Sequence, residues 1–287
     1  MMNTLESIQK RVREMPAVSS NTIRILELIS DEDYSIKDLS ALISMDVSLA
    51  TKCLKIVNSA KFGLRTTVTS IERAVSYLGK QAIFGLIVES GFDYVFNSAL
   101  EGYDAQEGEL WEHSLRTAIA SRLISVRIRE KDLADVAYTA GLLHNMGKVV
   151  LTDYLKHQTK IIREKFSDSK EVDFSKLEKE LLDINHEAVG KMMAEKWGIP
   201  EPLCMVIYYH HNPSEAPEEF RKLCYIVHLG DHFAMLSGSM SSFDSLAYEV
   251  DPASKGFLKL EDEEIESLMF DIELEVIHAK DKIFSMD

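Results

Sequence analysis

The chain has 287 residues, with 32 Lys and Arg against 47 Asp and Glu, and its formal net charge is −15. This acid excess disfavours a general nucleic-acid binder, which needs clustered positive charge to hold phosphates. Thirteen Gly and six Pro are few for this length, which argues against turn-rich β architecture and favours an all-α fold. Because no apolar run approaches the roughly 18 residues of a membrane span, we expect a cytoplasmic protein that does not bind membranes.

Cysteine usage agrees with a cytoplasmic location. Cys53, Cys204 and Cys224 are odd in number and show no Cys-x-x-Cys spacing. This pattern argues against both a disulfide framework and a thiolate zinc site. We interpret the three residues as buried free thiols in a reducing compartment.

Helical periodicity dominates the first hundred residues. Three apolar stripes recur every three to four positions: Ile23, Leu26 and Ile29; Val47, Ala50, Leu54 and Val57; and Ile71, Ala74, Val75 and Leu78. Ser35 with Asp38, and Thr69 with Glu72, have the form of capping boxes and predict two helix starts. The short helices at 36–57 are compatible with a helix-turn-helix reader of DNA, but the net charge favours ordinary helix packing.

The stretch EGYDAQEGE at 101–109 lacks apolar periodicity, and we place a domain boundary there. It divides the chain into an N-terminal helical lobe, 1–105, and a second helical lobe with a C-terminal helix, 106–287. The first hundred residues hold 11 basic and 11 acidic side chains, which leaves 21 and 36 for the rest. The acid excess therefore belongs to the second lobe, whereas residues 51–80 form a basic patch in the first.

Beyond this boundary the sequence again predicts helices. One is expected from about 110 to 128, and a second ends in AGLLHNMGK. Gly198 and Pro200 end a further helix, after which Pro202 opens the next. The last helix carries an apolar stripe of Ile265, Leu268, Ile272 and Val276.

Five of the nine histidines stand in distinctive contexts. They are His113 in LWEHSLRTA, His144 in GLLHNMGK, His186 in DINHEAVG, and His210 and His211 in IYYHHNP, with Asp231 following in VHLGDHFA. Neutral imidazole is the commonest metal ligand and also a common proton carrier. A lone helical histidine is more often structural, which is how we interpret His157, His228, His232 and His278.

This order of residues resembles the HD superfamily of helical metal-dependent phosphohydrolases. The segments NSAKFGLRTTVTSIERAVSYLGKQAIFGLIV, GLLHNMGK and HEAVG…WGIPEP…HHNP resemble more closely the HDOD family, the HD-related output domains of bacterial signalling proteins. Together they cover residues from about 15 to 235. The resemblance implies two helical lobes, the second a degenerate HD-like bundle, with metal ligands at His113, His144, Asn145, His186, His210, His211 and Asp231.

The resemblance also implies roles for single residues outside the ligand set. Lys148 in HNMGK matches a lysine placed to meet a substrate phosphate as a compact cation, and the alternative is a surface lysine at a helix end. Three further residues fit the family signature, and we interpret them as structural. They are Asn58, expected as a loop amide, Gly63, expected as a turn glycine, and Trp197, expected as a core anchor.

Asn145 stands where an HD hydrolase carries the aspartate that, by resemblance, links two metal ions. An amide offers one neutral oxygen where a carboxylate offers two anionic ones, so a binuclear centre is not expected. The remaining imidazoles and Asp231 suit one divalent transition metal, such as Fe, Zn, Ni or Mn. A metal-free network of hydrogen-bonded imidazoles stays open as the alternative. If His210 and His211 are helical, they point about 100° apart, and one of them favours the site.

These features favour a bacterial regulatory protein of signal transduction that acts by binding a ligand or a partner protein. The locally basic N-terminal lobe is the candidate surface for a signalling partner, and the upstream signal and downstream partner are expected on other chains. The alternative is a metal-dependent phosphohydrolase or phosphodiesterase acting on a nucleotide or a related phosphoester, in which a metal-bound water attacks phosphorus. The acidic second lobe counts against polyanionic substrates.

Overall fold

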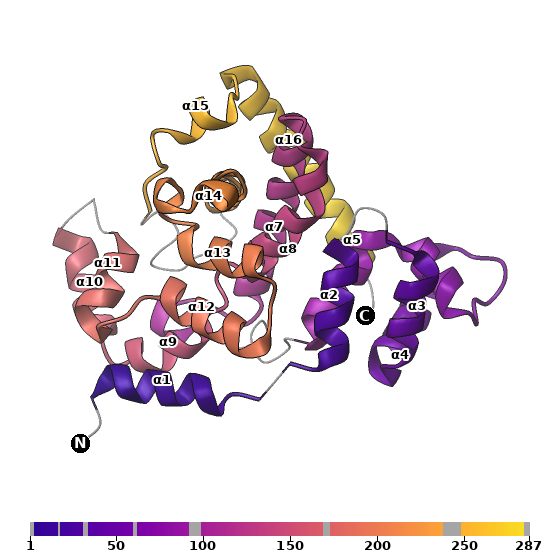
Figure 1. Cartoon of the computed structure of the whole chain (residues 1–287), viewed down its shortest axis with the longest axis horizontal. Coiled ribbons are helices and arrows are strands. Elements are labelled where there is room, and N and C mark those ends of the chain that lie inside the picture. The colour runs from indigo at the N-terminus through magenta and orange to yellow at the C-terminus, as the bar shows by residue number, and fades with distance from the viewer. Residues whose placement is uncertain are drawn as a thin grey trace. The chain divides into compact units, whose positions relative to one another are not determined.

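A computed structural model of the chain describes residues 3–16, 18–30, 34–59, 62–91, 99–168, 173–237 and 248–283. Within these ranges the regular elements are all helices (Figure 1), and the β pairing is a single isolated bridge between Leu100 and Ala105. The predicted all-α class is therefore confirmed. None of the described helices is both long and apolar enough to cross a membrane.

The chain forms two compact units. One contains Met1–Ala17 and Tyr94–Met269, and the other contains Val18–Asp93 and Phe270–Asp287. Compactness alone does not define an independent domain, and the division into lobes 1–105 and 106–287 stays a prediction. The segment at 101–109, expected as a boundary, includes the fully buried Tyr103.

Within its described residues, the unit that starts at Val18 contains the helices α2 (Ser20–Ser30), α3 (Ile36–Ser44), α4 (Val47–Val57) and α5 (Ile71–Gly91). It also contains the end of α16 (Asp262–Ile283). The side chain of Ser35 accepts a hydrogen bond from the amide of Asp38 at 3.3 Å, as predicted. At α5 the hydroxyl that accepts an amide hydrogen bond belongs to Ser70, not to Thr69 as predicted, because the helix begins one residue later.

The apolar stripe predicted on α4 is wrong at its first position. Val47 is 78% exposed, whereas Leu49, Cys53 and Ile56 are buried. Asp46 caps the helix through the amide of Leu49, so Val47 stands at the first helical position. The spacing of three to four residues is compatible with two adjacent faces, and packing against α5 selects one of them.

Asn58 and Gly63 have the structural roles expected from the sequence. The side-chain amide of Asn58 donates to the carbonyl of Val68 at 2.7 Å, and its oxygen accepts from the amide of the same residue at 2.7 Å. Gly63 has a φ of 58°, in the left-handed region that favours glycine. Both residues shape the loop between α4 and α5.

The other unit is built from α1 (Thr4–Glu14), η2 (Glu101–Tyr103) and a longer helical series. That series is α7 (Glu109–Arg127), η3 (Lys131–Leu133), α8 (Ala134–Leu143), α9 (Lys148–Leu155), α10 (Thr159–Asp168), α11 (Phe174–Leu182), α12 (His186–Trp197), α13 (Glu201–Tyr209), η4 (Pro213–Glu215), α14 (Glu218–Leu236) and α15 (Ser254–Leu258). Gly198 ends α12 with a φ of 71°, and Pro202 lies in the first turn of α13, as predicted.

Helix α7 packs against both α8 and α14. Gly230 permits the close approach of α14, because a Cβ at this position would lie 2.5 Å from Oγ of Ser121 and 3.1 Å from the carbonyl oxygen of Thr117.

The indole of Trp197 is buried, as expected of a core anchor, and donates to the carbonyl of Pro16 at 3.1 Å. The ammonium of Lys196 donates to the carbonyl of Met15 at 2.6 Å, so α12 holds the segment that follows α1.

Candidate metal centre

Three helices bring a first group of ligand side chains together. His113 comes from α7, His144 follows the end of α8, and Asp231 comes from α14. Oδ1 of Asp231 lies 2.7 Å from Nε2 of His113 and 3.2 Å from Nε2 of His144. All three residues are buried, and their ligand atoms are close enough together to hold a metal ion.

The ring orientation of His144 leaves a buried nitrogen without a hydrogen bond. Its Nδ1–H donates to the carbonyl of Gly141 at 2.7 Å, which leaves Nε2 unprotonated in the neutral ring. Burial lowers the pKa of His144 despite the neighbouring Asp231. Its Nε2 therefore faces a carboxylate oxygen as a second acceptor, and among the described residues it has no hydrogen-bond partner. A cation between Nε2 of His144 and Oδ1 of Asp231 would be attracted by both atoms and would satisfy Nε2.

Asp231 carries the negative charge of this group. Burial opposes ionisation of the carboxyl, but the imidazoles of His144 and His113 outweigh it and hold the pKa of Asp231 well below its usual range. The first group therefore combines two imidazoles with one carboxylate, a donor set that fits a divalent transition metal.

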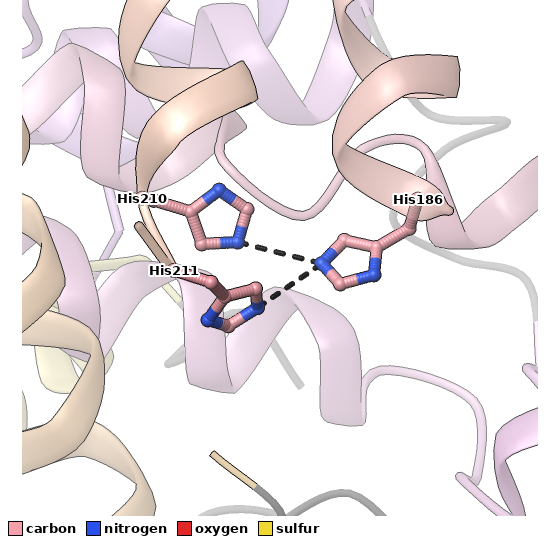
Figure 2. Close-up of side chains that lie close together, drawn as sticks. All are labelled: His186, His210 and His211. Atoms are coloured by element: carbon pink, nitrogen blue, oxygen red, sulfur yellow. Dashed lines mark hydrogen bonds between the residues drawn. The ribbon is translucent and has the colours of Figure 1, made fainter. Parts of the chain in front are cut away.

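A second group consists of three histidines whose Nε2 atoms converge (Figure 2). His186 is the first residue of α12, and His210 and His211 directly follow α13. Nε2 of His186 lies 3.4 Å from Nε2 of His210 and 3.2 Å from Nε2 of His211. Both adjacent histidines reach the site because the helix ends at Tyr209, and the ideal 100° separation does not exclude either one.

Local bonds fix two rings of the second group. Nδ1–H of His210 donates to the carbonyl of Ile207 at 2.9 Å, and Nδ1–H of His186 donates to Oε2 of Glu178 at 2.8 Å. Burial and the neighbouring imidazoles lower the pKa of His210 and of His211 well below the usual range. At His186 burial also favours the neutral ring, but Glu178 and Glu187 outweigh it and raise the pKa. Without a metal, His186 is therefore the residue of this group that best holds a proton.

The two groups adjoin each other through His144 and His210, whose ring centroids are 5.0 Å apart. Gly147 permits the start of α9 to lie close to the start of α12, because a Cβ there would lie 2.0 Å from the carbonyl oxygen of His186. Asn145 is 1% exposed, and its Oδ1 has no hydrogen-bond partner among the described residues. The amide oxygen is thus a further buried, neutral donor next to His144 in the chain.

Lys148 is the first residue of α9 and is 2% exposed. Its ammonium lies 5.5 Å from the ring centroid of Tyr103 and 5.6 Å from that of Tyr248, within the range of cation–π attraction. The surface-lysine alternative is therefore wrong. The phosphate contact stays a prediction.

Two acidic side chains beside His186 are not predicted from the sequence. Glu178, from α11, and Glu187, from α12, form a third ligand-like group with His186. Burial and the nearby Glu178 raise the pKa of Glu187 despite the opposing effect of His186. Glu187 directly follows His186 in the segment HEAVG, so the sequence contains a local signal for this residue. Glu178 lies on a different helix and has no local motif, so helix packing alone reveals it.

The four histidines expected to be structural stay outside these groups in the described part of the chain. His228 is buried, donates to the carbonyl of His210 at 2.7 Å and accepts from the amide of Asp251 at 2.9 Å. His157 and His278 are exposed and His232 is buried.

A family model of the HDOD domain matches residues 15–213 of this chain. An uncharacterized protein of Treponema pallidum (strain Nichols) is 31% identical over 217 residues, which are 76% of this chain and 41% of the relative. The chain thus spans less than half the length of that relative.

Solved structures show the same fold. An HDOD domain protein of unknown function from Geobacter sulfurreducens has a TM-score of 0.71 at 22% identity, covering 98% of this chain and 97% of that one. A "Putative signal transduction protein" from Marinobacter aquaeolei VT8 has a TM-score of 0.73 at 23% identity, with 99% and 64% covered. A "Putative phosphohydrolase" from Shewanella amazonensis SB2B has a TM-score of 0.60 at 20% identity, with 98% and 96% covered.

Proposed function

Because the chain belongs to the HDOD family, we propose that it is a bacterial signal-transduction protein whose buried histidine centre binds one divalent transition metal. The metal serves a regulatory interaction with a ligand or partner protein. The observation that carries the proposal is the buried Nε2 of His144, which faces Asp231 at 3.2 Å without a hydrogen bond. A buried polar atom without a partner is costly, and a metal ion would satisfy it.

The residues that would hold the metal are drawn from the two adjoining groups: His113, His144, Asp231, His186, His210 and His211. Asp231 supplies the ionised carboxylate of the first group, and Asn145 replaces a second carboxylate by a neutral amide. Because Asp231 is the single carboxylate among these six residues, we expect one divalent ion rather than two. A bound metal would supply Lewis acidity and lower the pKa of a bound water.

Elemental analysis of protein purified without chelator tests the metal centre. We expect about one equivalent of a transition metal in the wild type and a clear loss in His144→Ala. Circular dichroism of the variant controls for unfolding. Wild-type protein that stays metal-free after incubation with Fe²⁺, Zn²⁺, Ni²⁺ and Mn²⁺ would support the alternative, a metal-free network of hydrogen-bonded imidazoles.

The alternative function is a metal-dependent phosphohydrolase. The burial of Lys148 beside Tyr103 and Tyr248 favours it, because this places a cation within the same unit as the histidine groups. A phosphodiester hydrolysis assay with Mn²⁺, Fe²⁺, Ni²⁺ and Mg²⁺ separates the two functions. The regulatory proposal predicts no turnover above background, and turnover abolished by His144→Ala would overturn it.

The partner surface proposed on the N-terminal lobe is the basic patch at 51–80. Lys55, Arg65 and Arg73 are exposed there, and such a patch suits an acidic protein surface. Lys61, also part of the patch, lies outside the described residues. With a candidate signalling partner, Arg65→Glu is expected to weaken binding by increasing charge repulsion, whereas His144→Ala leaves it intact. Equal losses in both variants would contradict separate roles for the patch and the histidine centre.

A further inference from the structure

A buried carboxylate beside His186 accepts three hydrogen bonds. Oε2 of Glu178 accepts from Nδ1 and from the backbone amide of His186, each at 2.8 Å. Its Oε1 accepts from the hydroxyl of Tyr103. Glu178, His186 and Tyr103 are all fully buried, so these bonds do not compete with bulk water.

These bonds determine which nitrogen of His186 faces the other histidines. A carboxylate only accepts, so the ring proton of neutral His186 belongs on Nδ1 and the lone pair on Nε2. That Nε2 is the atom that lies 3.2 Å from His211 and 3.4 Å from His210 (Figure 2). A carboxylate bonded to the far nitrogen of an imidazole ligand fixes the ring and raises its basicity.

The neighbouring carboxylate offers a matched comparison. Oε2 of Glu187 lies 3.3 Å from the same Nδ1 but forms no hydrogen bond among the described residues. The other oxygen of Glu187 accepts from the hydroxyl of Ser175 at 2.6 Å. Glu178 therefore holds the ring by direct bonds, whereas Glu187 adds nearby charge alone.

We propose that Glu178, held by Tyr103, is the positioning residue of the group formed by His186, His210 and His211. It orients the lone pair of His186 and strengthens cation binding at this group through its charge. The inference rests on the proposed metal centre and extends it, because it adds a residue outside the ligand set that determines how His186 faces the ion. Tyr103 acts indirectly, by holding the carboxylate in place.

Titration of the metal-free full chain with Co²⁺, in competition with a chromophoric chelator, measures the contribution of Glu178. Glu178→Gln keeps an oxygen for the two N–H groups of His186 but removes the charge, and we expect Co²⁺ binding to weaken about 10- to 100-fold. Tyr103→Phe is expected to weaken it less. Glu187→Gln is the control, with a loss smaller than that of Glu178→Gln. Thermal unfolding of the metal-free variants detects a merely structural effect.

A second readout does not depend on metal. Long-range ¹⁵N–¹H NMR of the metal-free protein is expected to place a proton on Nδ1 of His186 in the wild type and in Glu178→Gln, and to show its loss in Glu178→Leu. A wild-type ring protonated on Nε2 alone would overturn the positioning role.

The affinity results separate this inference from the proposed function. Equal Co²⁺ affinities in the wild type and Glu178→Gln would overturn the positioning role while leaving the metal centre intact. Wild-type protein that binds no Co²⁺ or other tested metal would overturn the metal centre and the affinity effect together, and the NMR result would then decide the ring orientation by itself.

Discussion

The ring of Tyr248 stacks on the ring of His211, with centroids 3.7 Å apart and planes inclined by 12°. Three residues later, the amide of Asp251 donates to Nε2 of His228, whose Nδ1–H donates to the carbonyl of His210. His228 therefore ties the segment that carries Tyr248 to the turn that carries His210 and His211. This arrangement covers one face of His211 and fixes its ring.

Replacing Tyr248 by Ala is expected to accelerate metal release. An aromatic pair contributes about 0.5–1.5 kcal/mol beyond area burial, which corresponds to a rate increase of about 2- to 10-fold. Transfer of Co²⁺ from the loaded protein to a chromophoric chelator measures this rate. Tyr248→Phe keeps the stacked ring and is expected to behave as the wild type. Equal rates in all three proteins would show that the stacking does not limit release.

Asn145→Asp is expected to raise metal affinity by about 10-fold or more. The buried amide oxygen lacks a hydrogen-bond partner among the described residues, and a carboxylate of nearly equal size adds the charge that a divalent cation favours. Competition with a chelator measures the affinity, and Asn145→Ala is the control that removes the oxygen. No gain in Asn145→Asp would indicate that residue 145 does not contribute to the ion site.

Gly147→Ala is expected to destabilise the protein by about 3 kcal/mol. The new Cβ would lie 2.0 Å from the carbonyl oxygen of His186, and backbone atoms cannot move aside cheaply. Gly256→Ala is the control, since a Cβ there has no described neighbour within 4 Å, and it is expected to stabilise by about 0.4–1 kcal/mol. Denaturant unfolding gives both values. A wild-type stability for Gly147→Ala would show that α9 and α12 are less tightly packed than described.

The three cysteines are expected to react slowly with thiol reagents in the native protein. Burial raises the pKa of Cys53 and of Cys224 to about 12 and that of Cys204 to about 11. Because the thiolate is the nucleophile, raised pKa values leave the thiols neutral and unreactive at pH 8. Ellman titration is expected to find almost no fast thiols before denaturation and three after it. Rapid labelling of a native cysteine would contradict this burial.

Local sequence signals predicted the helices better than their buried faces. Ser35 caps α3 as predicted, because a cap depends on residues within one helical turn. The predicted buried face of α4 is wrong at Val47, which is exposed. Neighbouring residues on a helix point about 100° apart, and the sequence does not say which of two adjacent stripes packs against α5.

The candidate site shows the same division. His113, His144, His186, His210, His211 and Asp231 were chosen from their motifs, and the structure brings them into two adjoining groups. Their role as metal ligands stays a prediction. The sequence could not predict that Glu178 and Tyr248 lie at this site, because neither belongs to a local motif with the histidine that it contacts.

The sequence by itself determined the all-α class, through the small number of helix breakers and through apolar residues that recur every three to four positions. It also identified the histidines and Asn145. Only the tertiary structure decided which imidazole nitrogens face one another, why Lys148 is buried and which carboxylate holds His186. The physical reason is that periodicity and capping act over a few residues, whereas ring orientation and burial depend on helices packed together from distant parts of the chain.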